Sequence, residues 1–91
     1  MKYIFTRAGK DGTWKDCSCS FRLGLDKKFV LYFDQITPEI GLNDGNFHAV
    51  DRLEGIVTDM IIDAYGICLE GCFININGRW HKDGFCLKFA P

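Results

Sequence analysis

The 91-residue sequence lacks the features that mark a membrane protein or an exported one. No apolar run approaches the ~20 residues that a helix needs to cross a bilayer, so we expect no membrane span. The chain begins with only three apolar residues in a row, at positions 3–5, before Thr6 and Arg7. That stretch is too short for the core of a signal peptide, so we expect a cytoplasmic protein.

Motifs for catalysis or metal binding are also missing. The chain has two histidines and five cysteines, and the odd number without an export signal favours free thiols over a disulfide framework. Cys17 and Cys19 flank one residue, and Cys68 and Cys72 flank three, whereas zinc knuckles usually hold C-x₂-C pairs. We expect all five cysteines to be reduced and metal-free, no cofactor, and no enzymatic activity.

Two alternative functions stay open. One is a protein that binds a small ligand or nucleotide in an apolar pocket between a helix and a sheet. The other is a small zinc or thiol-dependent enzyme, for example with Cys86 as nucleophile and His81 as base. The basic, glycine-containing stretch 6–13 lacks the spacing of a phosphate-binding loop and is interpreted as a hairpin turn.

The composition that is present indicates one small folded domain, residues 1–91. Apolar residues make up 47% of the chain and aromatic residues 14%, which is enough for one core. Alternating or continuous apolar residues predict strands, which cover residues 2–6, 14–23, 29–33, 67–76, 79–81 and 85–90. Gly71 suggests a bulge, Asn77-Gly78 predicts a type I′ turn, and residues 82–84 predict another turn. The continuous apolar run 29–33 predicts a central strand covered on both faces.

One segment, residues 47–66, has apolar residues at helical spacing. Its apolar side chains recur at steps of three and four: Val50, Leu53, Val57, Met60, Ile61 and Ala64. We expect an amphipathic helix there, ended by Gly66. The expected fold class is therefore α+β, a curved antiparallel sheet of about five to six strands with one helix packed on a face, in the order β-β-β-α-β-β-β.

Charge is divided unevenly along the chain although the net charge is only −1. Residues 1–33 carry +4, residues 34–75 carry −7 and residues 76–91 carry +2. The acidic residues of the middle segment fall off the predicted helical stripe and are expected to form one acidic surface. Its members are Asp44, Asp51, Glu54, Asp59 and Asp63. Such a surface favours a partner protein with a basic surface and disfavours direct binding of nucleic acid.

A second candidate contact lies at the last hairpin, where Trp80 stands among Arg79, His81 and Lys82. Tryptophan and arginine dominate interface energies, and a tryptophan can also stack a base. We expect a protein-binding module that blocks or modulates its partner. By analogy of size and charge alone, it resembles phage and mobile-element inhibitors of host defence enzymes, including anti-CRISPR proteins.

Overall fold

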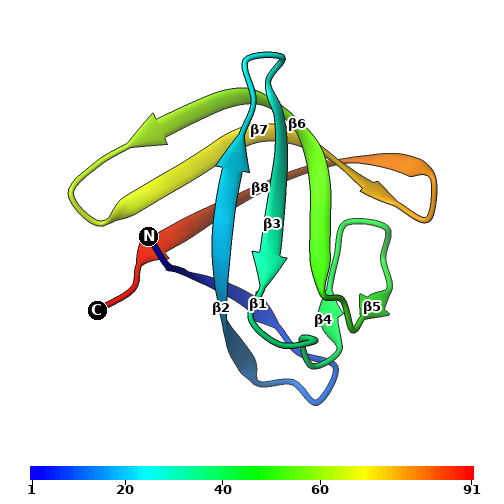
Figure 1. The fold of residues 1–91 in the computed structure, drawn as a ribbon. Coiled ribbons are helices and arrows are strands. Elements are labelled where there is room, and N and C mark those ends of the chain that lie inside the picture. Colours follow the sequence, from blue (N-terminus) through cyan, green and yellow to red (C-terminus); the bar gives the residue numbers. More distant parts are fainter.

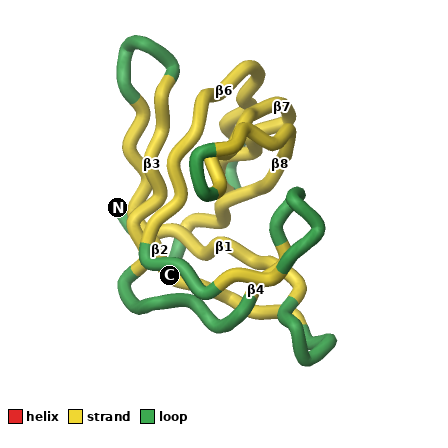
Figure 2. The backbone as a smooth tube through the Cα atoms, turned by 90° about the vertical axis from the view of Figure 1, so that its right-hand side faces the viewer, coloured by secondary structure: helices red, strands yellow, loops and turns green.

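The computed structural model describes all residues 1–91 and contains eight strands and no helix (Figures 1 and 2). The strands are β1 (Tyr3–Ala8), β2 (Trp14–Leu23), β3 (Lys28–Phe33), β4 (Ile40–Gly41), β5 (Phe47–His48), β6 (Arg52–Ile62), β7 (Gly66–Ile76) and β8 (Arg79–Phe89). The expected α+β class is therefore wrong, and the protein is all-β. Nothing in it is a helix long and apolar enough to cross a membrane.

Six of the strands form a closed antiparallel barrel in the order β1-β2-β3-β6-β7-β8. Each barrel strand pairs with the next one along the chain, and β1 closes the circle by pairing with β8, where Phe5 lies opposite Leu87. The short strands β4 and β5 form a separate two-stranded sheet in the connection between β3 and β6. Figure 1 shows this small sheet at one end of the barrel and both chain termini close together.

The segment predicted as a helix is instead mostly the long strand β6. Two properties of the sequence explain this outcome. Residues 56–62 contain five β-branched residues out of seven, which favour extended backbone, and Gly55 is a poor helix residue. The helical period was misleading because Leu53 and Val57 are four residues apart, a spacing that places them on one side of a helix and also on one side of a strand.

Several other predictions can be compared with the structure. The strand at 14–23, the bulge near Gly71 and the Asn77-Gly78 turn are confirmed, the last with φ values of 52° and 83°. The segment at 29–33 is not covered on both faces, since Tyr32 is exposed on the outside of the barrel. The turn expected at residues 82–84 does not exist either, because β8 continues through Asp83, which is buried.

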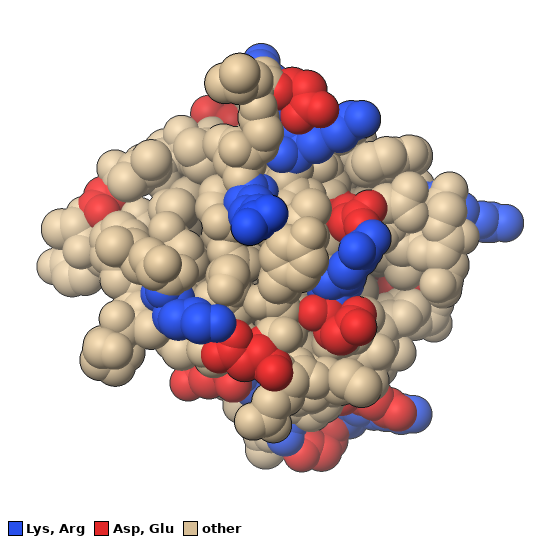
Figure 3. Space-filling model, viewed as in Figure 1, with Lys and Arg blue, Asp and Glu red and all other residues tan.

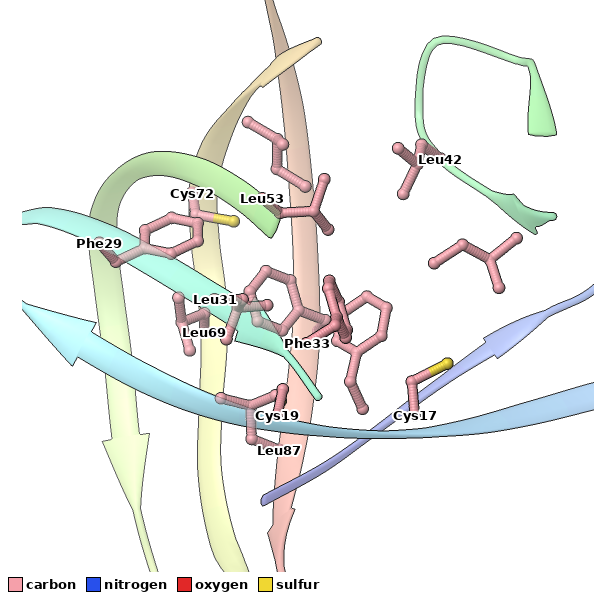
Figure 4. Packing of buried hydrophobic residues seen from close by; sticks show 14 of the residues in the cluster. Cys17, Cys19, Phe29, Leu31, Phe33, Leu42, Leu53, Leu69, Cys72 and Leu87 are labelled. Atoms are coloured by element: carbon pink, nitrogen blue, oxygen red, sulfur yellow. The ribbon is translucent and has the colours of Figure 1, made fainter. Parts of the chain in front are cut away.

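The inside of the barrel is filled by side chains from all six of its strands. Figure 4 shows the rings of Phe29 and Phe33 packed among aliphatic residues from neighbouring strands, with Cys17, Cys19 and Cys72 facing the same interior. Phe5 packs between residues of β3 and β8, because the centroid of its ring lies 5.5 Å from that of Phe33 and 5.3 Å from that of Phe85. The barrel is thus a packed core and a scaffold for its surface.

The connection between β3 and β6, residues 34–51, closes one end of the barrel. Ile40 and Leu42 are buried against the core, and Ile40 bridges to Gly9 of the first hairpin. Thr37 fixes the connection to the strand that follows, since its backbone N–H donates to the Val50 carbonyl and its hydroxyl accepts from the Val50 N–H. We call residues 34–51 the cap. These contacts explain why so long a connection is ordered.

One cysteine pair differs from the expectation of five free thiols. Cys68 of β7 lies directly opposite Cys86 of β8, with 4.0 Å between the Cα atoms, and the two form a disulfide. The other three cysteines are free and buried. Sequence spacing does not reveal such a pair, because strand register decides which cysteines meet.

Candidate interaction surface

The five acidic residues predicted as one surface are distributed along the molecule. Asp44 lies in the cap, Asp51 precedes β6, Glu54 is on its outer face, Asp59 is at its bulge and Asp63 is in the turn after it. The span from Asp51 to Asp63 is about 35–40 Å of extended chain. The structure therefore does not bring these carboxylates together, because a strand spreads residues that a helix would have stacked.

Two of these carboxylates are engaged within the chain. Asp44 accepts a hydrogen bond from the Asn46 backbone N–H at 2.9 Å, and its carboxylate contacts His48 Nε2 at 2.7 Å. Partial burial acts to raise the pKa of Asp44, but these hydrogen bonds outweigh it and the pKa lies below its usual range. Asp63 holds the β6–β7 turn, since its Oδ1 accepts from the backbone N–H groups of Tyr65 and Gly66. Both carboxylates therefore stabilise the loops that contain them.

The second predicted contact is partly assembled. Trp80 lies opposite Asn75, which in turn lies opposite Glu54, so these three share the outer side of the β6-β7-β8 sheet. Lys82 is on the same side, opposite Phe73. Arg79 faces the other way, because it lies opposite the inward-facing Ile76 at the end of the hairpin.

Around Trp80 and Lys82 the barrel wall presents a surface that was not predicted. It adds exposed or half-buried aromatic and aliphatic side chains from β3, β6 and β7. We call this surface the outer aromatic face; it consists of Arg22, Lys28, Val30, Tyr32, Arg52, Glu54, Ile56, Phe73, Asn75, Trp80 and Lys82. The signal in the sequence was alternation: Phe73 and Asn75 interrupt the buried Cys72, Ile74 and Ile76, as Val30 and Tyr32 interrupt the buried residues of β3.

The outer aromatic face carries more positive than negative charge. Its basic residues are Arg22, Lys28, Arg52 and Lys82, and its only acid is Glu54, which gives +4 − 1 = +3. Glu54 forms an ion pair with Arg52, and the Arg22 guanidinium lies 6.0 Å from the centroid of the Tyr32 ring. In the view of Figure 3, basic and acidic groups lie side by side in several places, and the surface between them is largely uncharged.

The free cysteines have the environment of core residues. Burial, followed by the nearby carboxylate of Asp34, raises the pKa of the Cys19 thiol to about 11. Burial and then Asp83 raise the pKa of Cys72 to about 11, and its thiol contacts the Asp83 carbonyl at 3.4 Å. These thiols are protonated at neutral pH, and only a thiolate acts as a nucleophile.

The thiols are therefore expected to react in a fixed order. Native protein should show no reaction with a chromogenic thiol reagent, because the free thiols are buried, and unfolding without reductant should expose the three free cysteines. Mild reduction of native protein should release Cys68 and Cys86, the second of which is exposed. A rapidly reacting thiol in native, unreduced protein would contradict this assignment.

The surface contains several shallow hollows; one of about 280 Å³ lies between β2 and the start of the cap, and one of about 230 Å³ lies beside the β6–β7 turn. The first is lined by carboxylates, since Asp16 and Asp34 border it together with Ser18. Hydrogen bonds from Lys2 and Ser18 lower the pKa of Asp34. No group of three or more histidine, cysteine, aspartate or glutamate side chains converges to hold a metal ion. No helix exists beside which the expected ligand pocket would lie.

Comparison with known proteins adds no assignment: no family model, curated protein or solved structure matches this chain.

Proposed function

We propose that this protein is a non-catalytic protein-binding module that contacts its partner through the outer aromatic face. The observation that carries the proposal is the exposure of Tyr32, Phe73 and Trp80 together, with arginine and lysine side chains between them. Aromatic and arginine side chains supply most of the binding energy in protein interfaces. The excess of positive charge on this face suits an acidic patch on the partner.

The barrel is well suited to present such a face. Its strands are joined by backbone hydrogen bonds around the whole circle, and the interior is filled, so the exposed side chains stand on a preorganised wall. A binding surface that is ordered beforehand loses less conformational entropy when the partner binds. Because core side chains fill the inside of the barrel, a partner has access only to its outside.

A single-stranded nucleic acid is the second class of partner that aromatic and basic side chains can bind. Affinity for nucleic acid depends mainly on neutralising phosphates. Here Glu54 lies within the face, and the chain as a whole carries a net charge of −1. These charges favour a protein partner. That the partner is a host defence enzyme which this chain blocks stays a prediction from size and charge.

Two tryptophan variants, one on the outer aromatic face and one outside it, test the proposal. Trp80→Ala should weaken partner binding at least about tenfold, as expected for an interface hot spot, and adding Tyr32→Ala should weaken it further. Trp14→Ala is the matched control, because Trp14 is also exposed, at 74% against 52% for Trp80, but lies at the end of the first hairpin. The control should retain binding within about threefold.

The partner is first captured from a host-cell lysate with the wild-type chain, and binding is then measured by titration calorimetry. Circular dichroism should show that all variants remain folded, since the replaced side chains are exposed. Equal losses for Trp80→Ala and Trp14→Ala, or no loss for either, would place the contact elsewhere. Capture that disappears after nuclease treatment would identify a nucleic acid in place of the protein.

A further inference from the structure

The strand β6 extends well beyond the strand that pairs with its outer edge. β3 pairs with β6 from Arg52 to Ile56, and the last hydrogen bond on that side joins the Val57 N–H to the Lys27 carbonyl. Residues 59–62 pair only with β7, and Thr58 lies in the bulge between paired residues. In Figure 1, β6 turns at its upper end, passes behind the β2–β3 hairpin and continues to the left beside β7, and Figure 2 shows the hairpin standing apart from this end of β6. We call residues 58–62 the open β6 edge.

The open β6 edge has few of the features that protect an edge from pairing. Natural edges are usually blocked by lysine, proline, a bulge or a covering loop. Here the bulge and a single charge fall together at Asp59, and beyond them Met60, Ile61 and Ile62 follow without interruption. Ile61 and Ile62 are exposed at 48% and 64%.

A longer free edge, at the start of β8, is protected, in contrast to the open β6 edge. β8 pairs with β1 only through its last residues, so its first part also has a free edge. That part carries Arg79 and Lys82, and the Asn43 side chain of the cap donates to the Lys82 carbonyl at 2.9 Å. The start of β8 is therefore blocked, whereas the open β6 edge remains available.

Apolar side chains also flank the open β6 edge on its inner side. Met60 and Ile62 lie opposite the buried Leu69 and Ile67 and therefore face the inside of the barrel, as does the half-exposed Leu23 opposite Phe29. This is the end of the barrel that the cap does not cover. A strand added along β6 would place alternate side chains over these residues.

The acidic charge around the open β6 edge indicates which kind of strand would pair with it. Residues 53–78 contain no lysine or arginine and four acidic residues, of which Asp59 and Asp63 lie on or beside the open β6 edge. A second copy of this chain is disfavoured, because antiparallel pairing of two such edges brings like charges together. We propose that the open β6 edge binds an extended segment of another protein, with lysine or arginine alternating with apolar residues. Main-chain hydrogen bonds would supply the affinity, as in other cases of strand addition.

A synthetic peptide of alternating lysine and valine, seven residues long with blocked ends, tests the proposal on the full chain. Backbone amide NMR shifts of isotope-labelled protein should change saturably within residues 58–62. A peptide with glutamate in place of lysine should bind at least about tenfold more weakly, because its charge repels Asp59 and Asp63. A peptide of the same composition with its lysines and valines in two blocks should also bind at least about tenfold more weakly, because it cannot present one apolar side.

Two charge variants separate the edge from general electrostatics. Asp59→Lys should weaken binding of the lysine–valine peptide at least about fivefold, whereas Glu70→Lys should change it less than about twofold. Glu70 is the matched control, since it is an exposed acid on the same hairpin but belongs to β7. Equal effects of the two variants, equal binding of the block peptide, or shifts confined to other strands would overturn the proposal.

A last measurement tests whether two copies of this chain pair through the open β6 edge. If the amide shifts of residues 58–62 depend on protein concentration without peptide, the edge pairs with itself and the proposal is wrong. The open β6 edge is separate from the outer aromatic face, so Asp59→Lys should leave the effect of Trp80→Ala unchanged. Failure of the strand proposal would therefore not affect the proposed function, and the reverse also holds.

Discussion

Replacing Asp83 with alanine is expected to destabilise the folded protein by about 3 kcal/mol, because it leaves the Arg7 guanidinium charged and unpaired inside the barrel. Asp83 lies under the cap end of the barrel with its side chain only 2% exposed, and it forms an ion pair with Arg7, whose side chain is 18% exposed. The guanidinium also lies 5.6 Å from the centroid of the Phe5 ring. The value is at the lower end of the range for a broken buried pair because Arg7 keeps some contact with water.

Two further variants distinguish the cost of a buried unpaired charge from the cost of a lost contact. The double variant Arg7→Met with Asp83→Leu should be about as stable as the wild type or more stable, since apolar residues can replace a buried ion pair without cost. Glu39→Ala breaks the ion pair with Lys10, in which the Lys10 side chain is 66% exposed and the Glu39 side chain 52% exposed, and should cost less than about 1 kcal/mol. Urea unfolding of all four proteins gives the comparison. A double variant as unstable as Asp83→Ala would show that the pair itself is required.

Gly55→Ala is expected to destabilise the protein by about 3 kcal/mol, the upper end of the usual range for an overpacked core. A Cβ atom built on Gly55 lies 2.2 Å from the Phe73 carbonyl oxygen and 2.5 Å from the ring of Phe29. The carbonyl belongs to the neighbouring strand β7 and the ring fills the centre of the core, so neither has room to move. The strand therefore requires glycine at this position because of close approach.

The same substitution separates the barrel from the helix that the sequence suggested. In the middle of an exposed helix, Gly→Ala stabilises by about 1 kcal/mol, so the two structures predict effects of opposite sign. Gly41→Ala is a matched control, because its nearest neighbour would be the Phe47 ring at 3.5 Å, an ordinary contact. Thermal and urea unfolding of both variants measure the difference. A Gly55→Ala protein as stable as wild type would contradict the close packing of β6 against β3 and β7.

Local patterns predicted the elements that depend on neighbouring residues alone. Cys17, Cys19 and Phe21 alternate with polar residues, and the strand they predicted has the same bounds as β2. Asn77 and Gly78 both accept positive φ, and the turn between β7 and β8 follows from that. The prediction that Leu53 and Val57 face the core was also correct, since both are buried. It was derived from a helix that the structure does not contain.

The candidate surfaces depended on pairing between strands, which local patterns do not contain. Trp80 and Lys82 were selected from the sequence for their residue types, but their neighbours Phe73, Ile56 and Tyr32 come from other strands. The acidic residues were grouped because a helix would have gathered them, and the strand β6 separates them instead. Interface residues can therefore be nominated from composition, whereas the surface they form requires the register.

By itself, the sequence determined the strand at 14–23, the turn at 77–78, the inward position of residues such as Cys17, Leu53 and Val57, and the uneven distribution of charge. Those properties follow from side-chain size, branching and hydrogen bonding over a few residues. Only the tertiary structure decided that β1 meets β8, that Cys68 meets Cys86, that Asp83 is buried beside Arg7 and that β6 extends past β3. These contacts join residues far apart in the chain, and the order and register in which the strands pair select them from many arrangements that the local pattern permits equally.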